Sequence, residues 1–179
     1  MPAPAVYGEI PRGLEDMAGY ILTGDVAGVK VDAPGARNLT CTIESDSDQL
    51  EGDNSVIAIV RNPKRLTGSA EVGRTNLAFF STILGGTATT GGSSPNTILT
   101  LDETASAGSR YFQLKGNTYS QDSSGSGYEL LLKKCLVTSG PTETLAVGEW
   151  STPTFDFEGS AISGVLLTRK NLETYAPLA

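Results

Sequence analysis

The stretch from Leu66 to Gly86, LTGSAEVGRTNLAFFSTILGG, predicts a strand, a tight turn and a helix in succession. Apolar or small residues alternate with polar ones from Leu66 to Val72, which is the period-two pattern of a strand with one solvated face. Gly73 marks the turn, and Thr75 or Asn76 can cap the helix that follows. A short helix is marginal by itself, so this one must pack on a sheet built by the rest of the chain.

The helix is expected to bury one face and to stop at a glycine pair. Gly85 and Gly86 are residues that end helices in the left-handed region of backbone conformation. Residues spaced three and four apart form the apolar stripe and two more widen it: Leu77, Phe80 and Leu84, then Phe79 and Ile83.

Composition and the remaining patterns favour short strands and many turns. The chain has 179 residues, which suits one domain with a substantial core, and it is rich in Gly, Ser and Thr. The most apolar strand candidate, Tyr128–Val137, is expected to be central. One or two strands are predicted within Tyr20–Val31, and further strands at Asn38–Ile43, Ile98–Leu101, Tyr111–Lys115, Glu149–Glu158 and Val165–Thr168.

Other segments are predicted to lack regular structure. Pro2, Pro4 and Pro11 favour an extended amino-terminal arm over residues 1–20. The remaining segments are an acidic loop at 44–55, flexible loops at 87–97 and 120–127, a turn at 140–144 and a carboxy-terminal tail at 170–179.

Charge and cysteine content exclude several classes of function. The formal net charge of −7 argues against a surface that grips nucleic acid. No stretch approaches the ~20 apolar residues of a membrane span, and the start of the sequence lacks the parts of a signal peptide. We therefore expect no membrane insertion and no Sec export. Cys41 and Cys135 are too few for a disulfide framework and are interpreted as buried small hydrophobic residues.

The residue content disfavours catalysis, metal binding and cofactor binding. The chain has no histidine, which removes the commonest general base and metal ligand. A calcium loop that begins at Asp46 fails, since Leu50 and Glu51 stand where Asp or Asn and then Gly belong. We expect no enzyme, no cofactor and no metal site. Carboxylates for glycoside hydrolysis could be assembled only from residues that equally suit solvated strand faces, namely Glu71, Glu149, Asp156 and Glu158.

The order of several sequence segments points to a protein family. An acidic loop ends in EGDNSVIAIVRNPK, and LTGSAEVG and TNLAFFSTILGG follow it. After the flexible loops come YFQLKGN, YELLLKKCLV and EWSTPTFDFEGSAI. This order resembles the major tail (tail tube) protein of long-tailed bacteriophages and related tail-like particles, over residues 40–170. The segment before it matches no part of that pattern.

The resemblance implies a mainly β fold with two packed antiparallel sheets, as a sandwich or partial barrel, flanked by one helix. It also implies hexameric rings that stack into a hollow tube, through which double-stranded DNA passes without specific binding. Its partners would be other copies of the chain and other tail proteins at the tube ends. Its location would be the virion tail, assembled in the host cytoplasm. Family members stack through a long early loop and the terminal arms, and residues 44–55 match that loop best.

Two strand faces are candidates for the wall of the lumen. Rings of carboxylates would repel phosphates, whereas a cationic wall would bind DNA and stall its transit. The alternative, that these faces meet bulk water, suits any half-exposed antiparallel sheet. The lumen candidates are Thr67, Ser69 and Glu71 on the first strand and Thr154, Asp156 and Glu158 on the closing strand.

Opposite charges between residues 44 and 74 are candidates for contacts between rings. An acidic loop that meets a basic corner of the next ring would set direction and register, and a head-to-tail contact that does not close produces a filament. The alternative is an ordinary mobile, solvated loop. The stacking candidates are the acids Glu44, Asp46, Asp48, Glu51 and Asp53, the apolar Leu50, and the basic Arg61, Lys64, Arg65 and Arg74.

The sequence also allows a second class of function, that of a binding module. A non-catalytic β-sandwich binding module, for carbohydrate or as a decoration domain of a capsid or tail, has the same strand-rich composition. Sugar-binding faces usually present several exposed aromatic rings. The chain has one Trp, Trp150, and six scattered Tyr, so its aromatic content favours the structural subunit.

Overall fold

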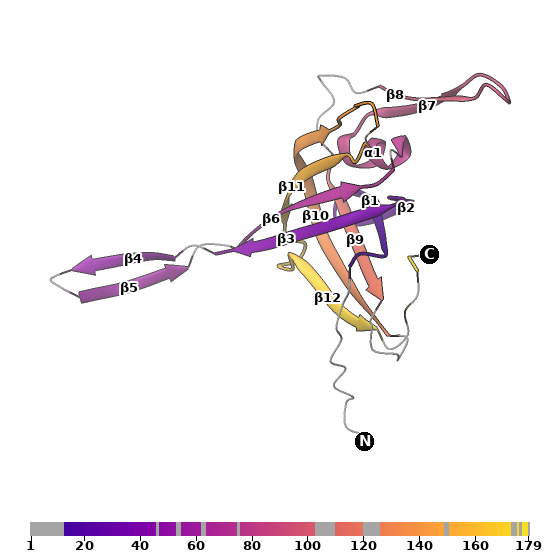
Figure 1. Cartoon of the computed structure of the whole chain (residues 1–179). Helices are drawn as coiled ribbons and strands as arrows, with labels where there is room; N and C mark the ends of the chain where they lie inside the picture. Colours follow the sequence, from indigo (N-terminus) through magenta and orange to yellow (C-terminus); the bar gives the residue numbers. More distant parts are fainter. Residues whose placement is uncertain are drawn as a thin grey trace.

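The chain is mainly β, with twelve strands and one helix among the residues that the structure describes (Figure 1). The computed structural model describes residues 13–45, 47–52, 55–61, 64–74, 76–102, 110–119, 126–148, 151–172, 175 and 177–178. For residues 48–52 and 55–61 it describes the backbone alone.

Eight strands form one antiparallel sheet in the order β2-β1-β9-β10-β11-β6-β3, with β12 also paired to β10. They are β1 (Asp16–Thr23), β2 (Val26–Asp32), β3 (Ala36–Glu44), β6 (Arg65–Val72), β9 (Phe112–Tyr119), β10 (Gly127–Thr142), β11 (Thr154–Ser160) and β12 (Leu167–Leu172). The other four strands form two hairpins that project from the body, β4 (Ser47–Gly52) with β5 (Ser55–Arg61) and β7 (Thr87–Gly91) with β8 (Ile98–Asp102) (Figure 1).

The sheet folds back on itself around β10. One edge of β10 pairs with β9, and the other edge pairs first with β12, up to Leu132, and then with β11, from Lys134 onward. The pairing with β9 shifts register between Leu132 and Cys135, and such an irregularity bends a strand. The β2-β1-β9 half therefore packs against the β11-β6-β3 half, and both supply core residues. The mainly β sandwich with one helix is confirmed, with β10 as the central strand.

The predicted helix is α1 (Leu77–Leu84), and its ends are those that the sequence indicated. The Oδ1 atom of Asn76 accepts hydrogen bonds from the backbone N–H groups of Ala78 (3.0 Å) and Phe79 (3.4 Å). The Nδ2 atom of Asn76 donates to the carbonyl of Asp32 (2.9 Å), which ties the helix to the end of β2. Gly85 ends the helix with a φ of 87°, in the left-handed region.

The buried face of α1 is rotated from the predicted stripe. Its fully buried residues are Phe79, Phe80, Thr82 and Ile83, whereas Leu77 and Leu84 lie at the margins. Helix spacing alone allowed the apolar stripe to be centred on either Phe80 or Phe79. Packing against the inner face of the sheet buries the side that contains Phe79.

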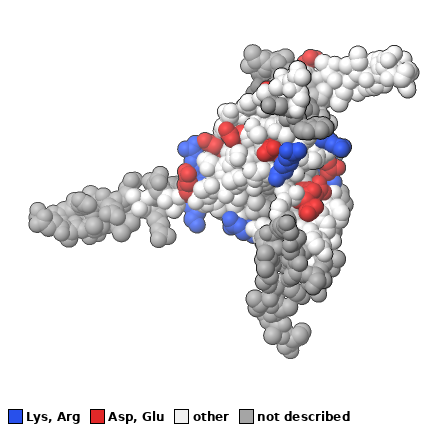
Figure 2. Space-filling model, in the orientation of Figure 1, with Lys and Arg blue, Asp and Glu red and all other residues white. Residues whose placement is uncertain are grey.

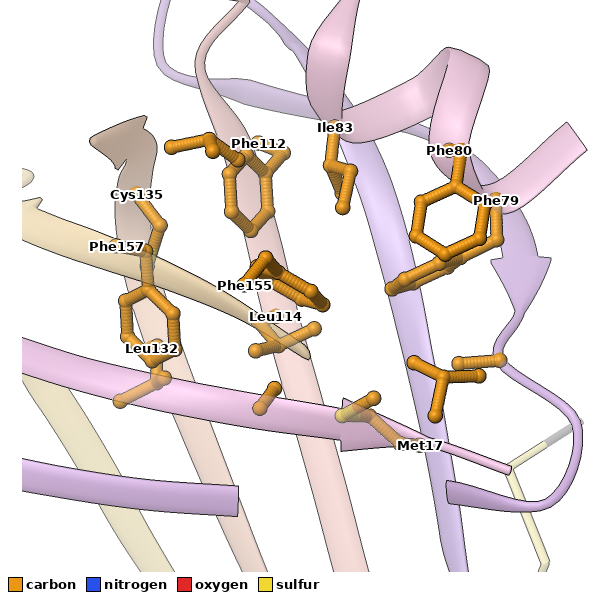
Figure 3. Close-up of a cluster of buried hydrophobic side chains, with 14 of the residues drawn as sticks. Met17, Phe79, Phe80, Ile83, Phe112, Leu114, Leu132, Cys135, Phe155 and Phe157 are labelled. Carbon is orange, nitrogen blue, oxygen red and sulfur yellow. The ribbon is translucent and has the colours of Figure 1, made fainter. Parts of the chain in front are cut away.

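An aromatic series joins the helix to the centre of the sheet. The ring centroids of Phe79 and Phe155 are 6.1 Å apart, and those of Phe155 and Phe157 are 6.3 Å apart (Figure 3). These residues are almost completely buried. Such tilted pairs contribute to stability beyond their buried area.

Glycines opposite large side chains let the neighbouring strands β3, β6 and β11 pack closely. A Cβ at Gly68 would overlap the carbonyl oxygen of Thr40 and lie 2.5 Å from Cζ of Phe157, the residue directly opposite on β11. A Cβ at Gly159 would overlap the side chain of Leu66, its own partner in register. Large and small residues thus alternate across the β6–β11 pair.

Several segments predicted as irregular are strands. In the predicted acidic loop 44–55, Glu44 ends β3, Ser47–Gly52 form β4 and Ser55 begins β5, because the apolar run of β5 pairs antiparallel with the acidic segment. Thr87–Gly91, within the predicted loop 87–97, is β7, since threonines favour a strand once β8 is there to pair with. Residues 140–142 continue β10, residues 16–20 begin β1, and residues 170–172 complete β12. The arm at 1–12 and the loop at 120–125 lie outside the described residues.

The tail that was predicted at 170–179 is anchored at Leu178. The backbone N–H of Leu178 donates a hydrogen bond to the carboxylate of Asp16 (3.0 Å), and the ammonium group of Lys30 donates to the carbonyl of Leu178. The side chain of Leu178 is buried, so this part of the tail belongs to the packed body.

A buried carboxylate holds three neighbouring strands together. Glu129 on β10 is 6% exposed, and its two oxygens lie 2.8 Å from Nζ of Lys115 on β9 and 2.9 Å from Nζ of Lys170 on β12. Burial raises the pKa of Glu129, but the hydrogen bonds and charges of the two lysines outweigh it, so the pKa lies below its usual value.

We predict that Gly68→Ala destabilises the protein by about 2 kcal/mol, because the added methyl group must displace the β3 backbone or the Phe157 ring. Urea-induced unfolding measures this free energy. Gly140→Ala is the matched control, since a Cβ there meets no atom within 4 Å. A Gly68→Ala protein as stable as the control would contradict this packing.

We predict that Glu129→Gln lowers the free energy of unfolding by about 2 kcal/mol at pH 7, because two lysines lose their carboxylate. A carboxyl with a lowered pKa stabilises the fold above its unfolded pKa, about 4.3, and this stabilisation is lost as the pH falls through the folded pKa. The difference between the two proteins should therefore shrink in urea titrations below about pH 4. The exposed Glu143→Gln should differ little from the unmodified protein at either pH.

Candidate functional site

The six lumen candidates lie together on one face of two neighbouring strands. In the β6–β11 pair, they stand directly opposite one another. Phe155 and Phe157 point from the same strand into the core, so the candidates occupy the outer face. The three pairs are Thr154 with Glu71, Asp156 with Ser69, and Glu158 with Thr67.

The polar face extends onto β3 and β10, which the sequence analysis did not assign to it. Asn38, Thr40 and Thr42 of β3 pair with the three β6 candidates, and all three are exposed. Ser139 and Thr142 of β10 pair with Asp156 and Thr154 of β11. The alternation of polar and apolar residues in NLTCTI could have indicated the solvated side of β3. Nothing in the sequence indicated that these four strands lie next to one another. We call the outer surface of β3, β6, β11 and the carboxy-terminal half of β10 the polar face.

The polar face is weakly acidic. The carboxylate of Glu158 forms an ion pair with Arg65. Among the described residues, no Lys or Arg forms an ion pair with Glu71 or Asp156. Asp156 is exposed and Glu71 is half-buried. Uncharged surface dominates the view in Figure 2, and side chains of both signs gather where the β4–β5 hairpin leaves the body.

The stacking candidates are divided between the two ends of β3 and β6. Glu44 ends β3, Asp48, Leu50 and Glu51 are residues of β4, and Arg61 ends β5, so these lie on or beside the hairpin. Lys64 and Arg65 are exposed at its base. Arg74, by contrast, follows the far end of β6. Asp46 and Asp53 lie outside the described residues.

Within the described part of the chain, neither projecting hairpin has a third strand. The β4–β5 and β7–β8 hairpins are each two-stranded sheets, and an isolated pair of strands is marginally stable in water. The β7–β8 hairpin has no charged residue before Asp102, and it exposes Ile98 (63%) and Leu99 (44%). Both hairpins therefore offer unpaired backbone edges to a partner.

One pocket bears on the binding-module alternative. It has a volume of about 340 Å³ and lies between the start of β3 and strands β9 and β10. Its lining includes Leu14, Arg37, Leu39, Asn117 and Tyr128. Tyr128 is its one aromatic residue among those described, which is fewer than a sugar-stacking platform needs.

The described residues contain no group of three or more Cys, Asp or Glu arranged to hold a metal ion. Nor does the described part of the chain contain a helix long and apolar enough to cross a membrane. Cys135 is fully buried and Cys41 half-buried, both unpaired, and burial raises the pKa of each thiol.

Comparison with known proteins adds no family assignment to this geometry. No protein-family model matches the chain, and no curated protein matches it either.

Proposed function

We propose that this protein is the structural subunit of a phage-type tail tube, which forms rings that stack into a hollow tube and let double-stranded DNA pass. The observation that carries the proposal is the polar face, where four adjacent strands present hydroxyl, amide and carboxylate groups in register. In the proposed ring this face lines the bore.

The chemistry of the polar face suits passage without binding. Neutral Ser, Thr and Asn side chains offer hydrogen bonds but no fixed positive charge. Glu71 and Asp156, which no described Lys or Arg neutralises, would repel phosphates. The one described cation paired on this face, Arg65, is neutralised by Glu158. A duplex carries one charge per ~1.7 Å, so even a few free cations per subunit would retain it.

The β4–β5 hairpin supplies the means of stacking. It leaves the body at the end of β3 and returns at the start of β6, the two strands beside each other in the polar face (Figure 1). Because the hairpin projects along the direction of β3 and β6, it would reach the subunit of the next ring if these strands line the bore. The partners proposed here are further copies of this chain and, at the tube ends, other tail proteins.

We predict annular oligomers or tubes with a central hole in negative-stain micrographs of the purified protein. A monodisperse monomer at high concentration and moderate salt would contradict the tube and favour the binding module. In a variant, a two-residue Asn-Gly turn replaces residues 45–64 and connects Glu44 to Arg65, its partner in register. This variant should fold, as judged by circular dichroism and its unfolding temperature, but should not form tubes.

We predict that tubes of Glu71→Lys/Asp156→Lys retain double-stranded DNA in co-sedimentation, whereas unmodified tubes do not. Each ring would then carry fixed cations in its bore, and the retained fraction should fall steeply with salt. The matched control is Glu15→Lys/Asp102→Lys, which makes the same change of charge at exposed residues outside the four strands of the polar face. Equal retention by the two variants would show that the polar face does not meet DNA.

A further inference from the structure

The sequence of the β4–β5 hairpin suits contact with a second surface. Among the described strands, β4 and β5 pair with each other alone, yet β5 reads SVIAIVR, a run suited to burial. The segment before it carries five acids, Glu44, Asp46, Asp48, Glu51 and Asp53. A complementary surface must therefore supply positive charge and apolar contact.

The basic residues at the base of the hairpin do not fit this role. Arg65 is already paired with Glu158 of its own subunit. Lys64 and Arg65 also lie at the end of the body from which the hairpin projects. In a stack of copies with the same orientation, the hairpin of one copy reaches the opposite end of the next copy. It therefore cannot meet the Lys64 and Arg65 of that copy.

A second basic site lies at the opposite end. β6 runs from Arg65 to Val72, so at about 3.3 Å per residue its ends are ~25 Å apart. Arg74 follows that far end, and Arg37 is the second residue of β3, the adjacent strand that runs the other way. Both arginine side chains are exposed.

Two glycines hold these arginines beside each other. The N–H of Gly73 donates to the carbonyl of Gly35 at 2.7 Å, and a Cβ on Gly73 would overlap that oxygen. The Nε atom of Arg37 lies 3.3 Å from the position of a Cβ on Gly73, and Cγ of Arg74 lies 3.5 Å from that on Gly35. Arg37 thus lies against Gly73, the residue before Arg74, and Arg74 lies against Gly35, two residues before Arg37.

The two guanidinium groups have no acidic partner among the described residues. The nearby carboxylate of Asp32 is paired with Lys30 (2.7 Å). Apolar surface is available at the same end, because β10 finishes there with Thr142, opposite the first residue of β11. Beyond it, Leu145 (89% exposed) and Val147 are open to solvent.

We infer that Arg37 and Arg74 form the receiving site for the acidic β4–β5 hairpin of a second copy of this chain. This inference rests on the proposed function and names the surface that completes its stacking contact. The contact is head-to-tail: each subunit presents the hairpin at one end and the arginine pair at the other. Such a heterologous contact leaves both ends of every assembly open and so continues as a filament.

Charge exchange tests the inference. Arg37→Glu/Arg74→Glu should raise the protein concentration needed for tube formation at least tenfold, as should Asp48→Arg/Glu51→Arg on the hairpin. Combining the two pairs restores opposite charges across the contact and should recover most of the assembly. Sedimentation and negative-stain microscopy measure the fraction of protein in tubes at each protein concentration. Lys64→Glu, which reverses one exposed charge at the wrong end, is the control and should assemble as the unmodified protein does.

The outcomes separate the inference from the function on which it rests. Unmodified protein that never assembles would contradict both. Tubes formed equally well by Arg37→Glu/Arg74→Glu, an equal defect in Lys64→Glu, or no recovery in the combined variant would overturn the arginine site alone. Comparisons are made between variants with the unmodified unfolding temperature. If Arg37→Glu/Arg74→Glu does not fold, Arg37→Gln/Arg74→Gln takes its place, with a smaller increase expected.

Discussion

The close packing of β6 against β11 and β3 is the constraint on which the rest of the structure depends. It exists because Phe157 lies over Gly68, and Leu66 over Gly159, without room for a Cβ on either glycine. The same arrangement recurs on β1, where a Cβ on Gly19 would lie 3.0 Å from the ring of Phe79. Large side chains over glycines let a single sheet curl tightly enough to enclose its own core, with α1 closing the remaining side.

The curl also determines what the outer surface can present. With the aromatic residues of β11 directed inward, its alternate residues and those of β6 must face outward in matched pairs. Because β3 and the end of β10 flank this pair, their hydroxyl and amide side chains extend the same surface. A continuous polar face is therefore a consequence of core packing, and in the proposed tube it is used as the wall of a bore.

Strand β10 links this wall to the remainder of the body. Its first half lies between β9 and β12, where Glu129 pairs with Lys115 and Lys170, and its second half joins β11. Ion pairs thus join strands within the packed body, whereas Arg37 and Arg74 have no acidic partner among the described residues. In the proposed tube, neighbouring copies of the chain would pair with the hairpin edges and with these arginines.

Local pattern was sufficient for the unit from Leu66 to Gly86, because strand alternation, the Asn76 cap and the Gly85 stop all act within a few residues of one another. It was also sufficient to name both strands that carry the lumen candidates, since period-two alternation needs no knowledge of neighbours. It failed where pairing decides structure: the acidic segment and the threonine-rich segment became strands only because β5 and β8 pair with them. It failed equally for Arg74. This residue is near Arg65 in the sequence, but the length of β6 separates the two in the structure. Arg74 instead lies beside Arg37, because Gly73 contacts Gly35. Strand order and register bring distant residues together and move close ones apart, and these depend on the packing of the whole chain.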